Sequence, residues 1–169
     1  MTLLKAAVKS MIKIKEHGFR YRGLDIKIHP LARIVKPEVI EIDDFAMIDD
    51  FAFINGGAGI KIGKYVHIGS FASVVGGGEL VIEDYATIGQ GTKIITAADG
   101  YLGDDMASAA VDENSGTATG GRVIIEKGAF IGNDVMIHPN VRIGQGSVID
   151  SYSRVVEDVR PKGINRERP

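Results

Sequence analysis

The sequence predicts an all-β fold, a parallel β-helix of short repeats, and three observations support this prediction. First, an Ile or Val recurs every six residues from Ile125 to Val155. Second, the same phase opens earlier blocks, whose first members Ile42, Ile62 and Ile82 stand 20 residues apart. Third, this period fits neither an α-helix nor an alternating strand. A fixed period of this kind indicates a solenoid of stacked coils.

The repeat also predicts how each coil is built. We call each six-residue repeat a six. Three sixes account for 18 residues, so a coil of 20 residues carries two more at one corner, where residues 56–59 and 76–78 are rich in glycine. The opening aliphatic of each six should point inward and stack on its equivalents, and β-branched residues suit such a surface. The fifth residue of each six should be small because the corner narrows there. Glycine at the second position should allow an unusual backbone φ; these glycines are Gly63, Gly69, Gly89, Gly132 and Gly144.

Taken in order, the chain reads as a single domain, residues 1–169, with a helix, a solenoid and a tail. Residues 1–18 have one apolar and one lysine-rich face, which predicts an N-terminal helical cap over the open end of the solenoid. A helix resting on a membrane surface is the alternative. Residues 28–159 are predicted to form the β-helix, and residues 160–169 a charged tail.

Four aromatic residues share the fourth position of a six: Phe45, Phe51, Phe71 and Tyr85. We expect them on a flat outer face of the solenoid. Exposed aromatic side chains on such a face favour association. They are therefore candidates for burial between subunits.

A long loop insertion interrupts the repeat at residues 96–122. Ile125 follows Ile82 by 43 positions, and removing one coil of 18 leaves an excursion of about 25 residues. The insertion is acidic and rich in small residues, and we expect a flap that packs on a neighbouring subunit. Its acidity could serve a polar sugar or could simply be solvated.

Composition excludes several classes of protein. The 169 residues carry a net charge of −2, without the basic stripe typical of nucleic-acid binding. The absence of cysteine excludes a disulfide scaffold and a thiolate nucleophile, and fits a cytoplasmic location. No apolar run reaches about 18 residues, so no transmembrane segment is predicted. Only two of the four histidines, His67 and His138, lie well inside the coils, so no metal site is expected.

Over residues 28–159 the repeat resembles the hexapeptide-repeat, left-handed β-helix acyltransferases, which include sugar O- and N-acetyltransferases. The resemblance implies a left-handed solenoid and a homotrimer with active sites between neighbouring chains. It also implies acetyl-CoA as acyl donor, and a sugar or nucleotide-sugar acceptor from surface polysaccharide biosynthesis.

The resemblance implies a catalytic histidine at the exit of the insertion, where this chain has Ala97, Ala98 and Asp99. Three hypotheses remain open. Asp99 could itself be the base or bind substrate; the acceptor could be an amine, which needs no strong base and is favoured; or the chain could be an inactive trimeric scaffold. His138, one coil beyond Ile95, and His67 are further candidates for the base. For both histidines the alternative is a structural, hydrogen-bonded residue.

The acyl-donor site is also implied by the resemblance. By register, Asn133, Ser151 and Val156 would contact the pantetheine arm of the CoA. Glu157 stands where a basic residue often meets a phosphate. Arg160 and Lys162 could take that role by charge, or could belong to a solvated tail.

Overall fold

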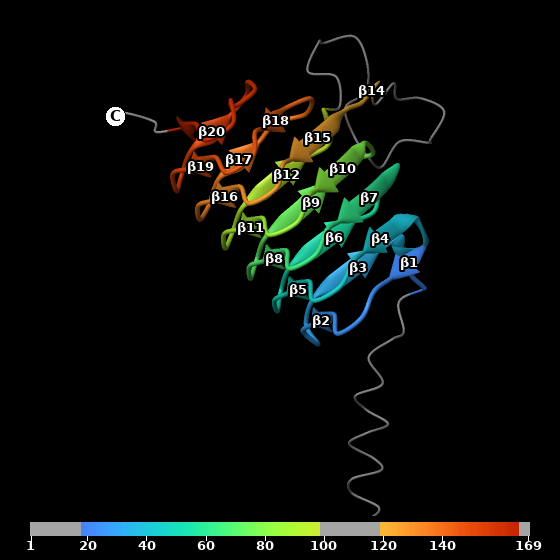
Figure 1. The fold of residues 1–169 in the computed structure, drawn as a ribbon. Helices are drawn as coiled ribbons and strands as arrows, with labels where there is room; N and C mark the ends of the chain where they lie inside the picture. The colour runs from blue at the N-terminus through green and yellow to red at the C-terminus, as the bar shows by residue number, and fades with distance from the viewer. Residues whose placement is uncertain (1–17, 99–118, 166–169) are drawn as a thin grey trace, which may run out of the picture.

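The protein is a triangular prism of three parallel sheets, wound as a left-handed parallel β-helix, as predicted (Figure 1). The structure is a computed structural model that describes residues 18–98 and 119–165. All but Gly18 of the predicted N-terminal cap, and most of the predicted insertion, therefore lie outside the described residues. Successive coils lie side by side from β1 at one end to β20 at the other.

Each face of the prism is one ladder of short strands. The first sheet contains β1 (Tyr21–Arg22), β4 (Ile40–Ile42), β7 (Gly59–Ile62), β10 (Glu79–Ile82), β15 (Arg122–Ile125) and β18 (Arg142–Ile143). The second sheet contains β2 (Lys27–Ile28), β5 (Met47–Ile48), β8 (His67–Ile68), β11 (Thr87–Ile88), β16 (Phe130–Ile131), β19 (Val148–Ile149) and β21 (Ile164–Asn165). The third sheet contains β3 (Arg33–Val35), β6 (Phe53–Asn55), β9 (Ser73–Val75), β12 (Lys93–Ile95), β17 (Met136–Ile137) and β20 (Arg154–Val155).

Two small elements stand apart from these sheets. A 3-10 helix, η1 (Pro37–Val39), lies between the third and first sheets of the first coil. The strands β13 (Ala97–Ala98) and β14 (Thr119–Gly120) pair antiparallel. They form the base of the insertion.

The predicted register is confirmed across the insertion. Ile42 pairs with Ile62, and Ile62 pairs with Ile82. Ile82 then pairs with Ile125, so the separation of 43 positions spans one coil and one excursion. The solenoid reaches further than predicted at both ends, because β1 pairs with β4 and β21 pairs with β19. Residues 160–165 of the predicted tail therefore continue the last coil.

The core is a stack of aliphatic side chains, one layer per coil. The opening residues of the sixes are buried, as predicted. Those with at most 1% of their surface exposed include Ile42, Ile48, Ile54, Ile82, Ile88, Ile94, Ile125, Ile131, Ile137, Ile143 and Ile149. Small residues fill the fifth positions and are buried too, among them Ala46, Ala86, Thr92 and Ser147. This pattern repeats unchanged on both sides of the insertion.

The fourth-position aromatics are exposed, as expected, but the prediction of a flat outer face was wrong. They lie at two of the three corners, which we call the first corner (between the first and second sheets) and the second corner (between the second and third). There the chain turns through a left-handed backbone conformation, with φ of 60° at Phe45 and 65° at Phe51. Phe45, Tyr65 and Tyr85 stack in one column with ring centroids 4.9 and 5.1 Å apart. Phe51 and Phe71 form a second column at 5.0 Å.

The prediction for the second-position glycines was also wrong in its reason. None of the five has a left-handed φ. A Cβ on Gly132 would instead lie 2.5 Å from the backbone N of Ser151, and a Cβ on Gly63 would lie 2.7 Å from that of Asp84. Glycine is needed there because the next coil approaches the backbone too closely for any side chain.

Candidate active site

The insertion leaves the solenoid at the third corner, between the third and first sheets. Thr96 is buried directly after β12, where its Oγ1 donates to Val75 O and accepts from Gly78 N, both at 3.2 Å. The ribbon of β13 and β14 then carries the chain away. Asp99, the first candidate base, follows β13 and lies outside the described residues, so its catalytic role remains a prediction.

His138 lies at the same third corner, directly after β17. Its backbone N donates to Val155 O at 2.9 Å, which holds it in the ladder. The next two residues pack against the returning insertion, because Asn140 Oδ1 accepts from Arg122 N at 3.2 Å. The predicted position of His138, near the exit of the insertion, is therefore confirmed; its role as a base stays a prediction.

The His138 ring is partly buried and contacts a positive charge. Arg154 Nε, one coil further, donates to His138 Nε2 at 2.9 Å. Burial first, and then the charge of Arg154, lower the pKa of His138 below its ordinary value of 6.5. The ring is therefore neutral near pH 7. Sequence analysis did not single out Arg154, because nothing in the repeat marks which outward residues meet across coils.

His67 lies elsewhere, on β8 in the second sheet. Its Nε2 lies 3.0 Å from Asp49 Oδ2 of the preceding coil, so the ring has a carboxylate partner. Its side chain is 37% exposed. Within one chain the structure therefore places His67 on the second sheet and His138 at the third corner, and it does not bring them together.

Asn133 and Ser151 lie together at the second corner, in neighbouring coils, as their spacing predicts. Asn133 N donates to Ser151 Oγ at 3.0 Å, and Asn133 Oδ1 accepts from Gln90 N at 3.0 Å. Each side-chain oxygen thus satisfies a corner N–H that no backbone carbonyl reaches. This structural duty does not depend on any bound CoA.

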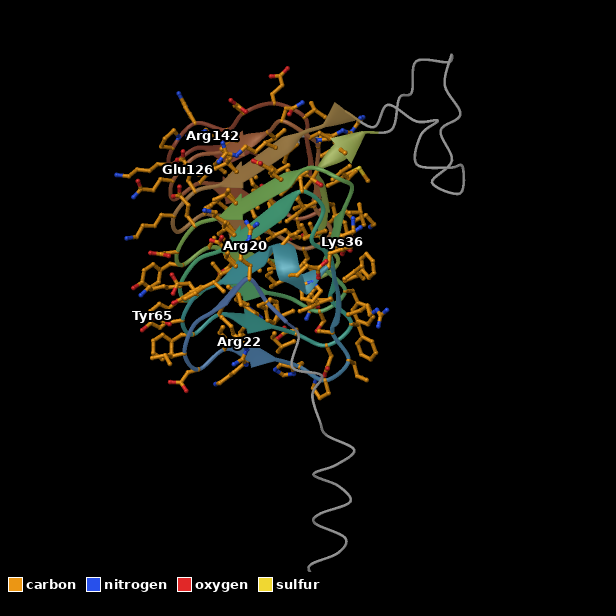
Figure 2. The ribbon with its side chains drawn as sticks, turned by 90° about the vertical axis from the view of Figure 1, so that its right-hand side faces the viewer. Arg20, Arg22, Lys36, Tyr65, Glu126 and Arg142 are labelled. Atoms are coloured by element: carbon orange, nitrogen blue, oxygen red, sulfur yellow. The ribbon has the colours of Figure 1, made fainter. Side chains whose placement is uncertain are left out.

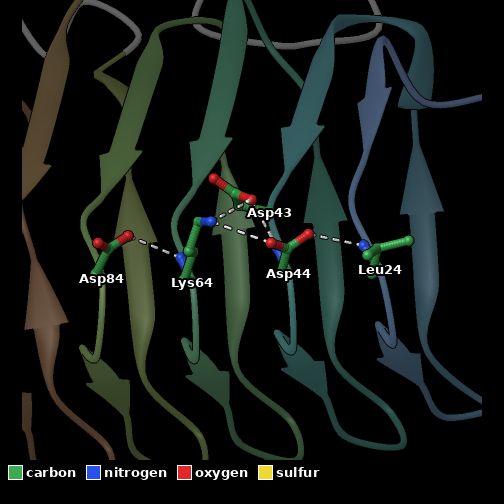
Figure 3. A network of polar contacts seen from close by, with 5 residues as sticks. All are labelled: Leu24, Asp43, Asp44, Lys64 and Asp84. Atoms are coloured by element: carbon green, nitrogen blue, oxygen red, sulfur yellow. Dashed lines mark hydrogen bonds and ion pairs between the residues drawn. The ribbon is translucent and has the colours of Figure 1, made fainter.

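The same capping occurs at the first corner (Figure 3). Asp44 Oδ1 accepts from Leu24 N, and Asp84 Oδ1 accepts from Lys64 N, each at 2.8 Å. Lys64 Nζ lies 3.0 Å from Asp44 Oδ2. The bond from Leu24 N, followed by that from Lys64, lowers the pKa of Asp44; the bond to Asp44 raises the pKa of Lys64. The recurrence of Asp, Asn or Ser at the third position of the repeat is the signal from which the sequence could have predicted these caps.

The remaining predicted CoA contacts gather at the last coil. A hollow of about 350 Å³ is lined there by Val156, Arg160 and Arg154, together with Glu157, Asp158, Val159, Gly163 and Ile164. Lys162 is exposed at a corner of this coil, with φ of 55°, outside that lining. Two carboxylates in the lining reduce its attraction for a phosphate. Asn133 and Ser151 are not part of this hollow, so one chain alone does not unite the five residues.

A second hollow, of about 420 Å³, lies on the first sheet and was not anticipated. Its lining mixes charges of both signs, with Lys61 Nζ 3.6 Å from Glu41 Oε2.

Figure 2 shows that Tyr65 and the Glu126–Arg142 ion pair project on the opposite side of the prism from Lys36. Within residues 18–98 and 119–165, no group of three His, Asp or Glu residues could hold a metal ion.

Comparison with known proteins places this solenoid among acyl-transferring enzymes. Residues 122–157 match the family described as Bacterial transferase hexapeptide (six repeats). The chain is 32% identical over 155 residues to the dTDP-4-amino-4,6-dideoxy-D-glucose acyltransferase of Escherichia coli, covering 91% of this chain and 81% of that protein. The chain therefore belongs to the hexapeptide-repeat acyltransferases, and the predicted family and enzyme class are confirmed.

Solved structures agree with this assignment. A variant of AntD, an N-acyltransferase from Bacillus cereus in complex with dTDP and coenzyme A, is 30% identical with a TM-score of 0.83, over 95% of this chain and 84% of that one. Another AntD variant, holding dTDP-4-amino-4,6-dideoxyglucose and coenzyme A, is 29% identical over 98% and 85% of the two chains, also with a TM-score of 0.83. The acetyltransferase VCA0836 of Vibrio cholerae, at 22% identity and a TM-score of 0.55, shares the fold. Among the residues that the structure describes, no helical segment has the length and hydrophobicity needed to span a lipid bilayer.

Proposed function

We propose that this protein transfers an acyl group from acyl-CoA to the amine of a dTDP-linked amino-dideoxy sugar. The observation that carries the proposal is the similarity, over 98% of this chain, to an N-acyltransferase structure that holds such a sugar and coenzyme A. The local sequence supports an amine acceptor, since Ala97 and Ala98 stand where the related O-acetyltransferases are expected to carry a histidine base. A neutral amine attacks a thioester without a strong base.

The chemistry needs little from the protein beyond positioning and charge stabilisation. The amine nitrogen attacks the thioester carbonyl carbon, and the carbonyl electron pair moves to oxygen. The carbon–sulfur bond then breaks, and the proton lost by the nitrogen goes to the departing CoA thiolate. Asp99 remains our candidate for binding the amine or relaying this proton.

We further propose a homotrimer with active sites between chains. The separation of the predicted CoA contacts supports this, because the second corner of one chain and the last coil of another could together line one donor site. The exposed aromatic corners supply surface for association. We place the reaction in the cytoplasm, where acyl-CoA is available, and within surface polysaccharide synthesis. Light scattering should then give a mass three times the 18.1 kDa of one chain.

Activity can be tested with acetyl-CoA and dTDP-4-amino-4,6-dideoxyglucose. The chain contains no cysteine, so a thiol-reactive dye reports only the CoA that is released. We expect thiol release with the amino sugar and none above background with the matching sugar bearing a 4-hydroxyl. A larger rate with the hydroxyl sugar, or no rate with either, would contradict the proposal.

The role of Asp99 needs its own comparison. Asp99→Asn removes the charge while keeping the shape, and Asp104→Asn is a control in the same insertion. We expect Asp99→Asn to lower kcat by at least about tenfold, in the range of acid–base contributions, while Asp104→Asn retains activity. Equal activity of the two variants would remove Asp99 from the mechanism.

A further inference from the structure

The pairing of His138 with Arg154 restricts what the histidine can do. A guanidinium group has only N–H donors and no acceptor. Because Arg154 Nε donates to His138 Nε2 at 2.9 Å, Nε2 must carry a lone pair rather than a proton. In the neutral ring the proton then resides on Nδ1.

The neutral form is the one that the surroundings favour. Burial and the positive charge of Arg154 both lower the pKa of His138. To act as a base through Nε2, the ring would have to lose its bond to Arg154 and become a cation beside another cation. Like charges in contact disfavour this state. Within residues 18–98 and 119–165, the Nδ1–H group of this ring has no hydrogen-bond partner.

We propose that His138 is a neutral hydrogen-bond donor rather than a base, and that Arg154 is the positioning residue that fixes its tautomer. This inference rests on the acyl-transfer function proposed above. The acceptor would be the thioester carbonyl oxygen, which gains negative charge when the amine attacks. A donor aimed at that oxygen stabilises the tetrahedral intermediate.

The position of the pair fits this role. His138 lies at the third corner, from which β13 leaves toward Asp99, and its neighbour Asn140 bonds the returning strand through Arg122 N. Arg154 also lines the hollow at the last coil that contains Val156, a predicted CoA contact. The pair thus bridges the exit of the insertion and a proposed part of the donor site.

Substitutions at His138 separate a donor from a base. In His138→Asn the amide N–H stands close to the place of Nδ1–H, but the amide cannot accept a proton. His138→Ala removes both functions. We expect His138→Asn to keep kcat within about tenfold, and His138→Ala to lose about 100- to 1,000-fold in kcat with little change in the KM for the sugar. Equal losses in both variants, or no loss in either, would overturn the donor role.

The positioning role has a readout that needs no substrate. With histidines labelled with ¹⁵N, long-range imidazole correlations distinguish Nδ1–H from Nε2–H, and comparison with His138→Asn identifies the His138 signals. We expect the Nδ1–H tautomer in the wild-type protein and a shift toward Nε2–H in Arg154→Met. Arg154→Lys should retain part of the wild-type pattern. An Nε2–H tautomer in the wild-type protein would refute the pairing.

The activity assays and the tautomer measurement can contradict different parts of the proposal. If the wild-type protein releases no CoA with any amino sugar, the proposed function falls and the donor role falls with it, whereas the tautomer measurement still tests the Arg154–His138 pair. If activity is present but His138→Asn is as slow as His138→Ala, only the donor role is overturned. Circular dichroism and light scattering on each variant confirm that fold and assembly are intact.

Discussion

The coils before the insertion and the coils after it share one core but differ at their corners. Before it, the coils are 20 residues long, and five of the left-handed positions at the first and second corners carry aromatic side chains, while Asp25 and Gly91 occupy the other two. After it, the strand register gives coils of 18 and then 16 residues, and in the described part of the chain Tyr152 is the one aromatic residue at these positions, beside Gly128, Asp134, Gly146 and Lys162. The predicted site residues, except His67 and Asp99, lie in the later coils. The core therefore specifies the fold, while the corners distinguish one region from the other.

Because the two regions have the same kind of core, truncating one buried isoleucine should destabilise either region by the same amount. Ile68 lies in a coil before the insertion and Ile131 in a coil after it, and both are at most 2% exposed. We expect Ile68→Ala and Ile131→Ala each to lower the free energy of unfolding by about 2–5 kcal/mol, from lost burial and a residual cavity. Urea unfolding measures both. A much smaller loss on one side would show that the two regions pack differently.

Coil spacing at the second corner differs between the regions. A Cβ on Gly132 would meet Ser151 N at 2.5 Å, whereas one on Gly69 would meet Gln90 N at 3.0 Å. We expect Gly132→Ala to cost about 1–3 kcal/mol through overpacking, and Gly69→Ala to cost less. Gly77→Ala is the control, because its Cβ would meet nothing within 4 Å. A Gly132→Ala variant as stable as the control would disprove the close approach.

The aromatic columns should stabilise only the earlier coils. Tyr65 stacks between Phe45 and Tyr85. Tyr152, at a corner after the insertion, is 77% exposed and has no ring partner in the described part of the chain. We expect Tyr65→Ala to lower the free energy of unfolding by about 1–3 kcal/mol, because the substitution removes two stacked ring pairs. Tyr152→Ala should stay within about 0.5 kcal/mol of the wild type. Equal effects would mean that stacking contributes nothing.

Corner caps occur in both regions, so substitutions can separate their structural role from substrate binding. Ser151→Ala and Asp84→Ala each remove one acceptor from a corner N–H. We expect each to lower the free energy of unfolding by about 0.5–1.5 kcal/mol. Only Ser151→Ala should raise the KM for acyl-CoA, because Asp84 is not among the predicted CoA contacts. If both variants keep the wild-type KM, Ser151 is a cap alone.

The smallest expected effect is the response of the first corner to acid. The folded protein lowers the pKa of Asp44 below its ordinary 3.8, so the carboxylate contributes stability above that pH. This contribution is lost as pH falls through the lowered folded value. In Asp44→Asn, an oxygen still faces Leu24 N but the charge is absent. The urea midpoint of the wild type should therefore fall more steeply below about pH 4 than that of Asp44→Asn. Parallel curves would contradict this.

The sequence predicted the parts of the fold that repeat. The opening aliphatic residues fixed which side chains point inward, and the spacing from Ile82 to Ile125 located the insertion, because each coil must stay in register with its neighbours. Contacts between coils were harder to predict. The approach of Gly132 to Ser151 N and the ring stack on Tyr65 depend on how one coil lies over the next, which a period along the chain does not contain.

The candidate site was predictable only in part, for the same reason. The spacing of Asn133 and Ser151 placed them together, and the position of His138 placed it near the insertion. Arg154 was missed, since its meeting with His138 joins two outward side chains whose rotamers the repeat leaves undetermined. The residue types alone also could not reveal that Asn133 and Ser151 already cap backbone groups.

The Tyr65–Tyr85 stack also gives the protein an internal optical reporter. The chain has no tryptophan and five tyrosines, two of which lie ring on ring at 5.1 Å in adjacent coils. Tyrosine emission and near-ultraviolet dichroism are therefore free of indole background and sensitive to the distance between these coils. A change in that signal during folding would time the moment at which one coil settles on the next.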